Sequence, residues 1–250
     1  MSEIGNLLKR IEANQAIIGN NRPLEQTQVQ NLRDYYKIGF VYASNALEGS
    51  TLTLSETKVV IEDGITIGGK PMRDHLDAVG NARAFDYIWQ LAKKTVLTEE
   101  DIKEIHKICF QPKDEDLAGQ YRKVNVLISG SQYNELIPDY TEVPKLMKEF
   151  ANNLPAKQSK EHPAIYAASI HRDFVYIHPF HDGNGRVARI LMNHAMLSQG
   201  YPVVVISPKF KNEYISALEK SRKNPDIFIE YTLEQLIEAQ KEYIRLLKLQ

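Results

Sequence analysis

The chain has 250 residues, of which 43% are hydrophobic and 25% charged, and its formal net charge is −1. These proportions are ordinary for a globular protein, and the near-neutral balance provides no overall basic field for nucleic acid. A single cysteine, Cys109, excludes an intrachain disulfide framework and fits a reducing compartment. No apolar run approaches the length of a membrane span, and the N-terminus does not resemble a signal peptide. We therefore expect a cytoplasmic protein without nucleic-acid or membrane partners.

Hydrophobic spacing along the chain predicts helices almost throughout. One stretch differs, because Val124, Val126 and Ile128 alternate with other residues before turn residues and Pro138, which predicts a small β-hairpin. The expected class is all-α with that one hairpin. We expect a helical extension over 1–70, a core over 71–220 and a C-terminal helix of the same domain over 221–250. The predicted helices cover residues 3–18, 27–47, 53–63, 75–94, 98–109, 143–153, 163–176, 185–199, 208–221 and 226–247.

The densest chemistry lies in residues 178–189, which read HPFHDGNGRVAR. His178 is a candidate base and Asp182 a candidate metal ligand. The Gly-Asn-Gly turn precedes an apolar helical pattern, and the N–H groups of such a helix start suit a phosphate. Arg186 and Arg189 are three residues apart and so share one helix face. The stretch therefore predicts an anion site with a base and a metal ligand beside it.

This stretch resembles the signature of the Fic family of adenylyl-transferring enzymes, H-P-F-x-[D/E]-G-N-G-R-x-x-R, and matches every fixed position. The resemblance extends over roughly residues 70–220. It implies transfer of AMP from ATP to a serine, threonine or tyrosine hydroxyl of a protein. His178 would be the general base and Asp182 the ligand of Mg²⁺. By the same resemblance, the anion hole is formed by Gly183, Asn184 and Gly185, and Arg186 contacts the β- and γ-phosphates.

A second stretch, Ser44 to Gly49, resembles the family's inhibitory helix, written [S/T]-x-x-x-E-[G/N]. By that resemblance Arg189 binds the γ-phosphate in the active state, and in the resting state Glu48 pairs with Arg189 and turns the α-phosphate of ATP away from in-line attack. Ser44 would hydrogen-bond in the anion hole or cap the local backbone. The alternative is that Glu48 is a solvated residue at a helix end. Some relatives also remove AMP with the same glutamate, and the sequence leaves open whether Glu48 does so.

Two further predictions concern the substrates. The predicted hairpin corresponds to the family's flap, which binds a target segment by strand pairing, and its contact positions would be Ile128, Ser129 and Gly130. An ordinary surface hairpin is the alternative. Asn193 and Tyr214 are candidates for the adenine pocket, since aromatic faces stack on purines, with core packing as the alternative for Tyr214.

Three other functions could use the same residues. A zinc site from His171, His178 and His181 fits no standard ligand spacing. A relative that transfers another phosphate-containing group would keep the fold and change the chemistry. A catalytically silent binding module would not be expected to retain the full motif. ATP and an unidentified target protein are the expected partners, while self-modification and a homodimer are left open.

Overall fold

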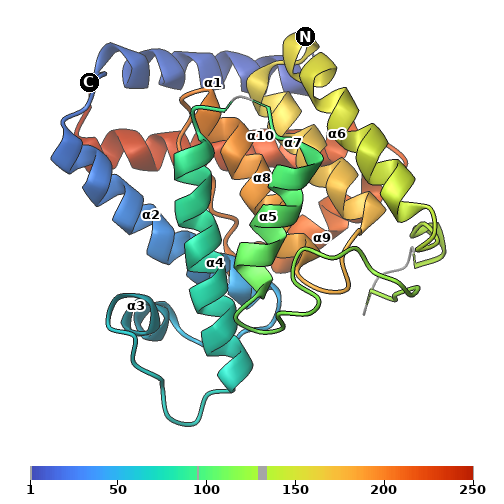
Figure 1. The fold of residues 1–250 in the computed structure, drawn as a ribbon. Helices are drawn as coiled ribbons and strands as arrows, with labels where there is room; N and C mark the ends of the chain where they lie inside the picture. The colour runs from blue at the N-terminus through green and yellow to red at the C-terminus, as the bar shows by residue number, and fades with distance from the viewer. Residues whose placement is uncertain (1, 95, 129–133, 250) are drawn as a thin grey trace.

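The computed structural model describes residues 2–94, 96–128 and 134–249. Its regular structure in these ranges is helical, which confirms the predicted class (Figure 1). Short 3₁₀ turns lie at Asn134–Leu136 and Pro208–Phe210. The α-helices are α1 (Glu3–Asn20), α2 (Gln26–Leu47), α3 (Leu54–Glu62), α4 (Met72–Leu91), α5 (Glu99–Phe110), α6 (Val143–Lys160), α7 (Pro163–Ile177), α8 (Asn184–Ser198), α9 (Lys211–Lys220) and α10 (Asp226–Leu247).

Local capping explains where several of these helices begin. The Thr53 hydroxyl accepts from the N–H of Glu56, and Thr98 does the same for Asp101, so both helices start with a capping box. The end of α6 lies beyond the predicted residue 153, because the helix continues through Pro155. Leu154 is buried there, and its packing offsets the backbone hydrogen bond that the proline cannot donate.

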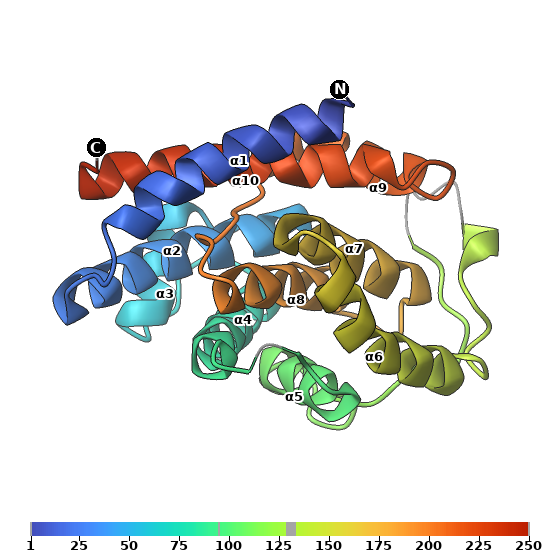
Figure 2. The same ribbon diagram turned by 90° about the horizontal axis from the view of Figure 1, so that it is seen from above.

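Helix α8 lies at the centre of the molecule and is buried over most of its length. It packs against α7 on one side and against α4 and α5 on another, as Figure 2 shows. Helix α1 lies along α10, although the two come from opposite ends of the chain. Ile11 of α1 and Leu236 of α10 belong to the same hydrophobic core as the residues of α8. This arrangement brings the C-terminal end of α2 beside the first turns of α8.

The segment predicted as a hairpin contains no strand ladder in its described parts, residues 122–128 and 134–138. Tyr121 makes one isolated antiparallel bridge with Phe180, and a 3₁₀ turn replaces the expected second strand. Arg122 holds the base of this segment instead, since its guanidinium donates to the carbonyl of Pro138 at 2.6 Å. Ser129 and Gly130, two of the three predicted target contacts, lie outside the described residues. In the described part of the chain, no helix is long and apolar enough to cross a membrane.

Candidate active site

His178 ends α7 in a backbone conformation that non-glycine residues rarely adopt, with φ 50° and ψ 58°. Two contacts hold it there. Its N–H donates to the carbonyl of Phe174 at 3.1 Å, and its carbonyl accepts from Nε of Arg122 at 2.9 Å. The left-handed residue turns the chain sharply out of α7 and into the loop that leads to α8. The position of the candidate base is therefore set by its own backbone.

Asn184 closes that loop with its side chain. Its Oδ1 accepts from the N–H of Phe180 at 2.9 Å, and its Nδ2 donates to the carbonyl of the same residue at 2.8 Å. Gly183, with φ 81°, forms the N-cap of α8. Because the Asn184 side chain is buried and used within the loop, only its backbone N–H remains for the expected anion hole.

His106 of α5 packs against the loop at Phe180 and Asp182. No motif in the sequence pointed to this residue. Its ring stacks on Phe180 with 3.7 Å between centroids. The N–H of Gly119 donates to Nδ1 at 2.8 Å, so Nε2 carries the proton and donates to the carbonyl of Asp182 at 3.0 Å. Burial lowers the pKa of His106 to about 4, which keeps the ring neutral and this tautomer in place. One feature of the sequence could have pointed to His106, namely its place among the inward-facing positions of an amphipathic helix.

The imidazole of His178 is suited to accept a proton. Burial, together with the positive charge of Arg122, lowers its pKa to about 4. The ring is therefore neutral at physiological pH, and a neutral imidazole is the form that a general base requires. A developing negative charge on bound phosphates would raise this pKa and strengthen the base.

Asp182 presents a partly exposed carboxylate at the edge of the loop, with 48% of its side chain accessible. Burial opposes its ionisation, but the Lys113 ammonium at 2.6 Å and the Arg186 charge outweigh that effect and lower its pKa. An ionised, accessible oxygen ligand fits the expected Mg²⁺. Lys113 occupies one of its oxygens in this structure, and no sequence motif points to this lysine.

The zinc alternative has no geometric support. No group of three or more histidine, cysteine, aspartate or glutamate side chains is placed to hold a metal within the described ranges. His171 is fully buried in α7, and its Nε2 lies 2.9 Å from the hydroxyl of Tyr214. His181 is exposed. The three histidines therefore serve separate roles.

Arg186 is buried and lies between two carboxylates. Its guanidinium forms a close ion pair with Asp77 of α4, and its Nη2 lies 3.7 Å from Asp182. Only 2% of its side chain is exposed. The expected contact with the β- and γ-phosphates is therefore not open in this conformation, in which the arginine anchors the loop to α4. Asp77 was not predicted, because an acidic residue on a helix gives no sign of its distant partner.

Arg189, one helical turn further along α8, is held mainly from α2. Its Nε donates to the hydroxyl of Ser44 at 2.9 Å and its Nη2 to the Ser44 carbonyl at 2.9 Å. Nη2 also donates to Oε1 of Glu48 at 2.6 Å, and Nη1 to the Tyr214 hydroxyl at 3.3 Å. Ser44 therefore neither caps its own helix nor lies free in the anion hole. Both of its oxygens bind the arginine.

The Glu48 carboxylate lies directly over the first turn of α8. A Cβ built at Gly185 would lie 2.2 Å from Glu48 Oε1, so only glycine permits this approach. Partial burial opposes ionisation of Glu48, but Arg189 outweighs it and lowers the pKa. The N-terminal turn of a helix favours negative charge. Glu48 thus places an anionic group where an anionic ligand of α8 would bind.

The two candidates for an adenine pocket are used inside the protein. Asn193 is fully buried, and its amide exchanges hydrogen bonds of 3.0 and 2.7 Å with the backbone of Val204. Tyr214 is buried and bridges His171 and Arg189. The structure gives neither side chain a face open to a purine, and Tyr214 has the packing role that was its alternative. Ile128, the remaining flap candidate, is half-buried at the end of a described range.

Comparison with known proteins identifies the family of this chain. Residues 96–196 match the model of the Fic/DOC family. The chain belongs to the Fic/DOC family. Over 181 residues, or 72% of its length, it is 35% identical to Protein adenylyltransferase Fic of Drosophila grimshawi, and it is 35% identical over 184 residues to the protein of the same name in Nematostella vectensis. It spans 37% and 42% of the length of these two relatives.

Solved structures of the family extend the similarity to nearly the whole chain. Fic-1 of C. elegans is 25% identical with a TM-score of 0.85, over 98% of this chain and 73% of that one. A Fic domain containing signaling protein of Bacteroides thetaiotaomicron is 28% identical with a TM-score of 0.80, over 96% and 95% of the two chains. The Fic fold thus accounts for the helices on both sides of the matched family region.

Proposed function

We propose that this chain is a protein adenylyltransferase that transfers AMP from ATP to a serine, threonine or tyrosine hydroxyl of a protein. The observation that carries the proposal is a neutral His178, fixed by its backbone beside the glycine-containing first turn of α8. This arrangement supports the proposal, because a proton acceptor lies beside a helix start whose N–H groups suit phosphates. The names of the Drosophila and Nematostella relatives support the same reaction.

In the proposed reaction, the target hydroxyl gives its proton to His178 as its oxygen attacks the α-phosphorus of ATP. The new oxygen–phosphorus bond forms as the bond to the β-phosphate bridging oxygen breaks, and pyrophosphate leaves. The N–H of Gly183 donates to Oδ1 of Asp182 at 2.6 Å in this structure, so the backbone N–H groups of residues 184 and 185 would stabilise the negative charge that develops on the phosphate oxygens. The side chain of Asn184 contributes indirectly, by holding these groups in place.

Asp182 would hold the magnesium ion that accompanies ATP. When bound, this ion supplies positive charge that neutralises the phosphate oxygens and screens their repulsion of an incoming nucleophile. To hold the ion, the Asp182 carboxylate would have to release the Lys113 ammonium, which lies 2.6 Å from it in this structure. Its low pKa keeps the carboxylate ready for this exchange at neutral pH.

We further propose that the structure represents a resting state inhibited by Glu48. The carboxylate that binds Arg189 lies over the first turn of α8, so it competes with phosphate both for the arginine and for the space above Gly185. ATP that binds beside it would present its α-phosphorus in a poor line for attack. Misplacement of reacting groups by about 1 Å can cost on the order of 100-fold in rate.

The test uses purified Glu48→Gly protein, candidate target proteins and ATP labelled at either the α- or the γ-phosphate. We expect the α-label to enter protein and the γ-label to remain in pyrophosphate. Addition of His178→Ala to the same variant should remove incorporation. Glu62→Gly, which changes an exposed glutamate at the end of α3, is the matched control and should behave as the parent.

The other outcomes separate the alternatives. Incorporation of the γ-label instead would indicate transfer of a different phosphate-containing group on the same fold. Binding of ATP without incorporation of either label into any protein, including the enzyme itself, would identify a silent binding module and overturn the proposal.

A further inference from the structure

The chain leaves α2 at Glu48 through a Schellman motif, a helix ending closed by backbone hydrogen bonds. The N–H of Ser50 donates to the carbonyl of Asn45 at 3.0 Å, and the N–H of Gly49 donates to the carbonyl of Ala46 at 3.1 Å. Gly49 has φ 95°, the left-handed conformation that this motif requires. These bonds fix the backbone on both sides of Glu48, so a contact that holds the next residue of the chain also holds the glutamate.

That next residue, Thr51, is bonded through its N–H, its hydroxyl and its carbonyl. The N–H and the hydroxyl both donate to Oδ2 of Asp74, at 2.7 and 2.8 Å. The carbonyl accepts from Nζ of Lys70 at 2.6 Å. Because Thr51 is exposed, these hydrogen bonds, and not burial, set its position.

Asp74 lies in the first turn of α4 and is only 2% exposed. Burial opposes ionisation of Asp74, but the bonds from Thr51 and the nearby Arg73 outweigh that effect and lower the pKa of the carboxyl. Arg73 lies 3.4 Å from Oδ1, and 67% of its side chain is exposed. A buried carboxylate is unfavourable unless it is hydrogen-bonded, and both short bonds to Asp74 come from Thr51, three residues after Glu48.

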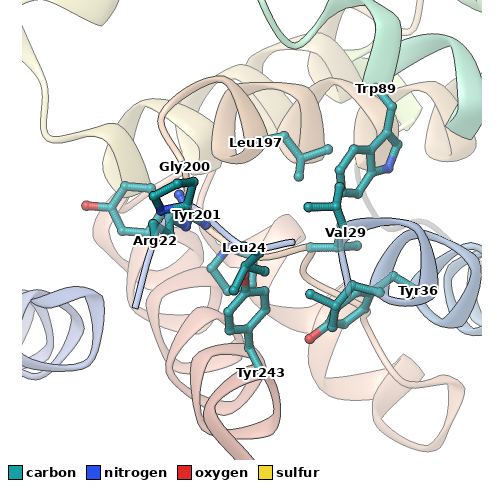
Figure 3. A pocket seen from close by; sticks show the side chains of 13 residues that line it. Arg22, Leu24, Val29, Tyr36, Trp89, Leu197, Gly200, Tyr201 and Tyr243 are labelled. Carbon is teal, nitrogen blue, oxygen red and sulfur yellow. The ribbon is translucent and has the colours of Figure 1, made fainter. Parts of the chain in front are cut away.

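The first half of α2 is packed less completely than the end that bears Glu48. Val29 and Tyr36 line a pocket of about 320 Å³ with Trp89 of α4 and Tyr243 of α10 (Figure 3). Side chains that face such a space lose part of their packing energy. Contacts at the C-terminal end of α2 therefore contribute more to the position of Glu48 than the packing of its first half does.

We propose that Asp74 is a positioning residue for inhibition, because by binding Thr51 it holds the exit of α2 against α4 and keeps the Glu48 carboxylate over the first turn of α8. The inference rests on the inhibition by Glu48 proposed above and names a second residue on which that inhibition depends. Without the contact to Asp74, the 2.6 Å bond between Glu48 and Arg189 would have to order the exit segment with less help from its backbone.

Two variants of the full-length protein test this role by initial rates of AMP transfer. Asp74→Asn weakens both bonds to Thr51, and Thr51→Val keeps the side-chain shape, removes only the hydroxyl bond and leaves the buried carboxylate in place. We expect rates of about fivefold and about threefold above wild type, as for the loss of hydrogen bonds to a charged group. Both gains should stay below that of Glu48→Gly, because Ser44 still binds Arg189.

The double variants and two controls separate positioning from general loosening of the fold. In the Glu48→Gly background, Asp74→Asn and Thr51→Val should add no further rate. Thr51→Ser restores the hydroxyl and should return the wild-type rate. Thr98→Val is the matched control, since the N–H and hydroxyl of Thr98 donate to Oδ2 of Asp101 at 2.6 and 2.7 Å in the same manner, at the start of α5. It should lower the urea midpoint of unfolding without raising the rate.

Four outcomes would count against the inference. Wild-type rates in both Asp74→Asn and Thr51→Val, beside a fast Glu48→Gly, would overturn it and leave the inhibition by Glu48 standing. Gains that persist in the Glu48→Gly background, or an equal gain in Thr98→Val, would also overturn it, because the effect would not act through Glu48. If Glu48→Gly itself did not exceed wild type, the proposed inhibition would fail and this inference would fail with it.

Discussion

The motif loop and Glu48 both contact the first turns of α8, but the protein holds them in very different ways. The loop is fixed from three directions by the Asn184 side chain, the ring of His106 and the guanidinium of Arg122. Within the described ranges, the hydrogen bonds of the Glu48 carboxylate reduce to the 2.6 Å bond from Arg189, and 44% of the Glu48 side chain is exposed. The difference indicates that the loop keeps its conformation, whereas the Glu48 carboxylate can leave Arg189.

The two arginines of the motif repeat this contrast on a smaller scale. Arg186 faces Asp77 within α4, whose side chain is 17% exposed, while Arg189 faces Glu48 at a helix end followed by Gly49 with φ 95°. A mutation on the loop side should therefore abolish activity or destabilise the fold. A mutation at Glu48 should release activity at little cost in stability.

The largest effect is expected at His178. In the Glu48→Gly background, His178→Ala should lower the rate of AMP transfer by about 1,000-fold, because general base catalysis by a positioned side chain is lost. His181→Ala, three residues away and exposed, is the matched control and should stay within about twofold of its parent. Initial rates with α-labelled ATP measure both. Equal losses in the two variants would mean that the loop, and not the base, had been damaged.

The next largest effect is expected at Asp77, the counter-ion of Arg186. Asp77→Asn should lower the free energy of unfolding in urea by about 3 kcal/mol, because it leaves a buried guanidinium without its main partner. Glu48→Gln should lower it by at most about 1 kcal/mol, since that carboxylate is partly exposed and the buried Arg189 keeps its two hydrogen bonds to Ser44. If Glu48→Gln were the more destabilising of the two, the contrast between a permanent loop and a removable glutamate would fail.

A smaller effect is expected at Lys113, whose ammonium lies on the carboxylate of Asp182. Lys113→Met should lower the Mg²⁺ concentration for half-maximal transfer by about threefold, because the ion no longer has to displace a partly exposed lysine. Lys107→Met removes a more exposed lysine of α5 and is the control. An unchanged Mg²⁺ dependence in Lys113→Met would show that Asp182 and this lysine do not compete for the ion.

The smallest effect concerns pH. The Arg189 charge lowers the pKa of Glu48 in the folded protein. The pairing therefore contributes its full stabilisation above the unfolded pKa of about 4.3. That stabilisation is lost only as pH falls through the lower folded pKa. The ratio of the Glu48→Gly rate to the wild-type rate should therefore stay constant from about pH 6 to pH 8. A ratio that fell steadily towards about pH 6 would indicate that another group controls inhibition.

The sequence predicted the helices closely because their apolar spacing and caps are local signals, as the capping box at Thr98 illustrates. It also predicted the meeting of Glu48 and Arg189, through a family resemblance. His106, Lys113 and Asp77 could not be found in this way, since each acts through a partner more than 60 residues away. A helix pattern shows which face is buried, but it does not show which distant polar group that face will meet.

The adenine candidates illustrate the same limit. A polar residue on a buried helix, such as Asn193, can serve either a ligand or the backbone of a neighbouring segment, and only the fold decides between them. Here the amide binds Val204 and so fixes the chain that follows α8. The prediction of hairpin strands was wrong for the described residues 122–128 and 134–138, and the reason is related. Arg122 ties that segment to the motif loop through hydrogen bonds that no alternating pattern encodes.

The charge of Glu48, acting through Arg189, is proposed to keep the site at rest, and the Glu48→Gln variant isolates that charge. Glutamine keeps the shape of the side chain and removes its charge. Initial rates of AMP transfer are compared for wild type, Glu48→Gln and Glu48→Gly. We expect both variants to exceed wild type by at least about tenfold, a difference of about 1.4 kcal/mol in activation free energy. Wild-type rates in both would contradict the claim, and a fast Glu48→Gly beside a slow Glu48→Gln would show that bulk, and not charge, blocks the site.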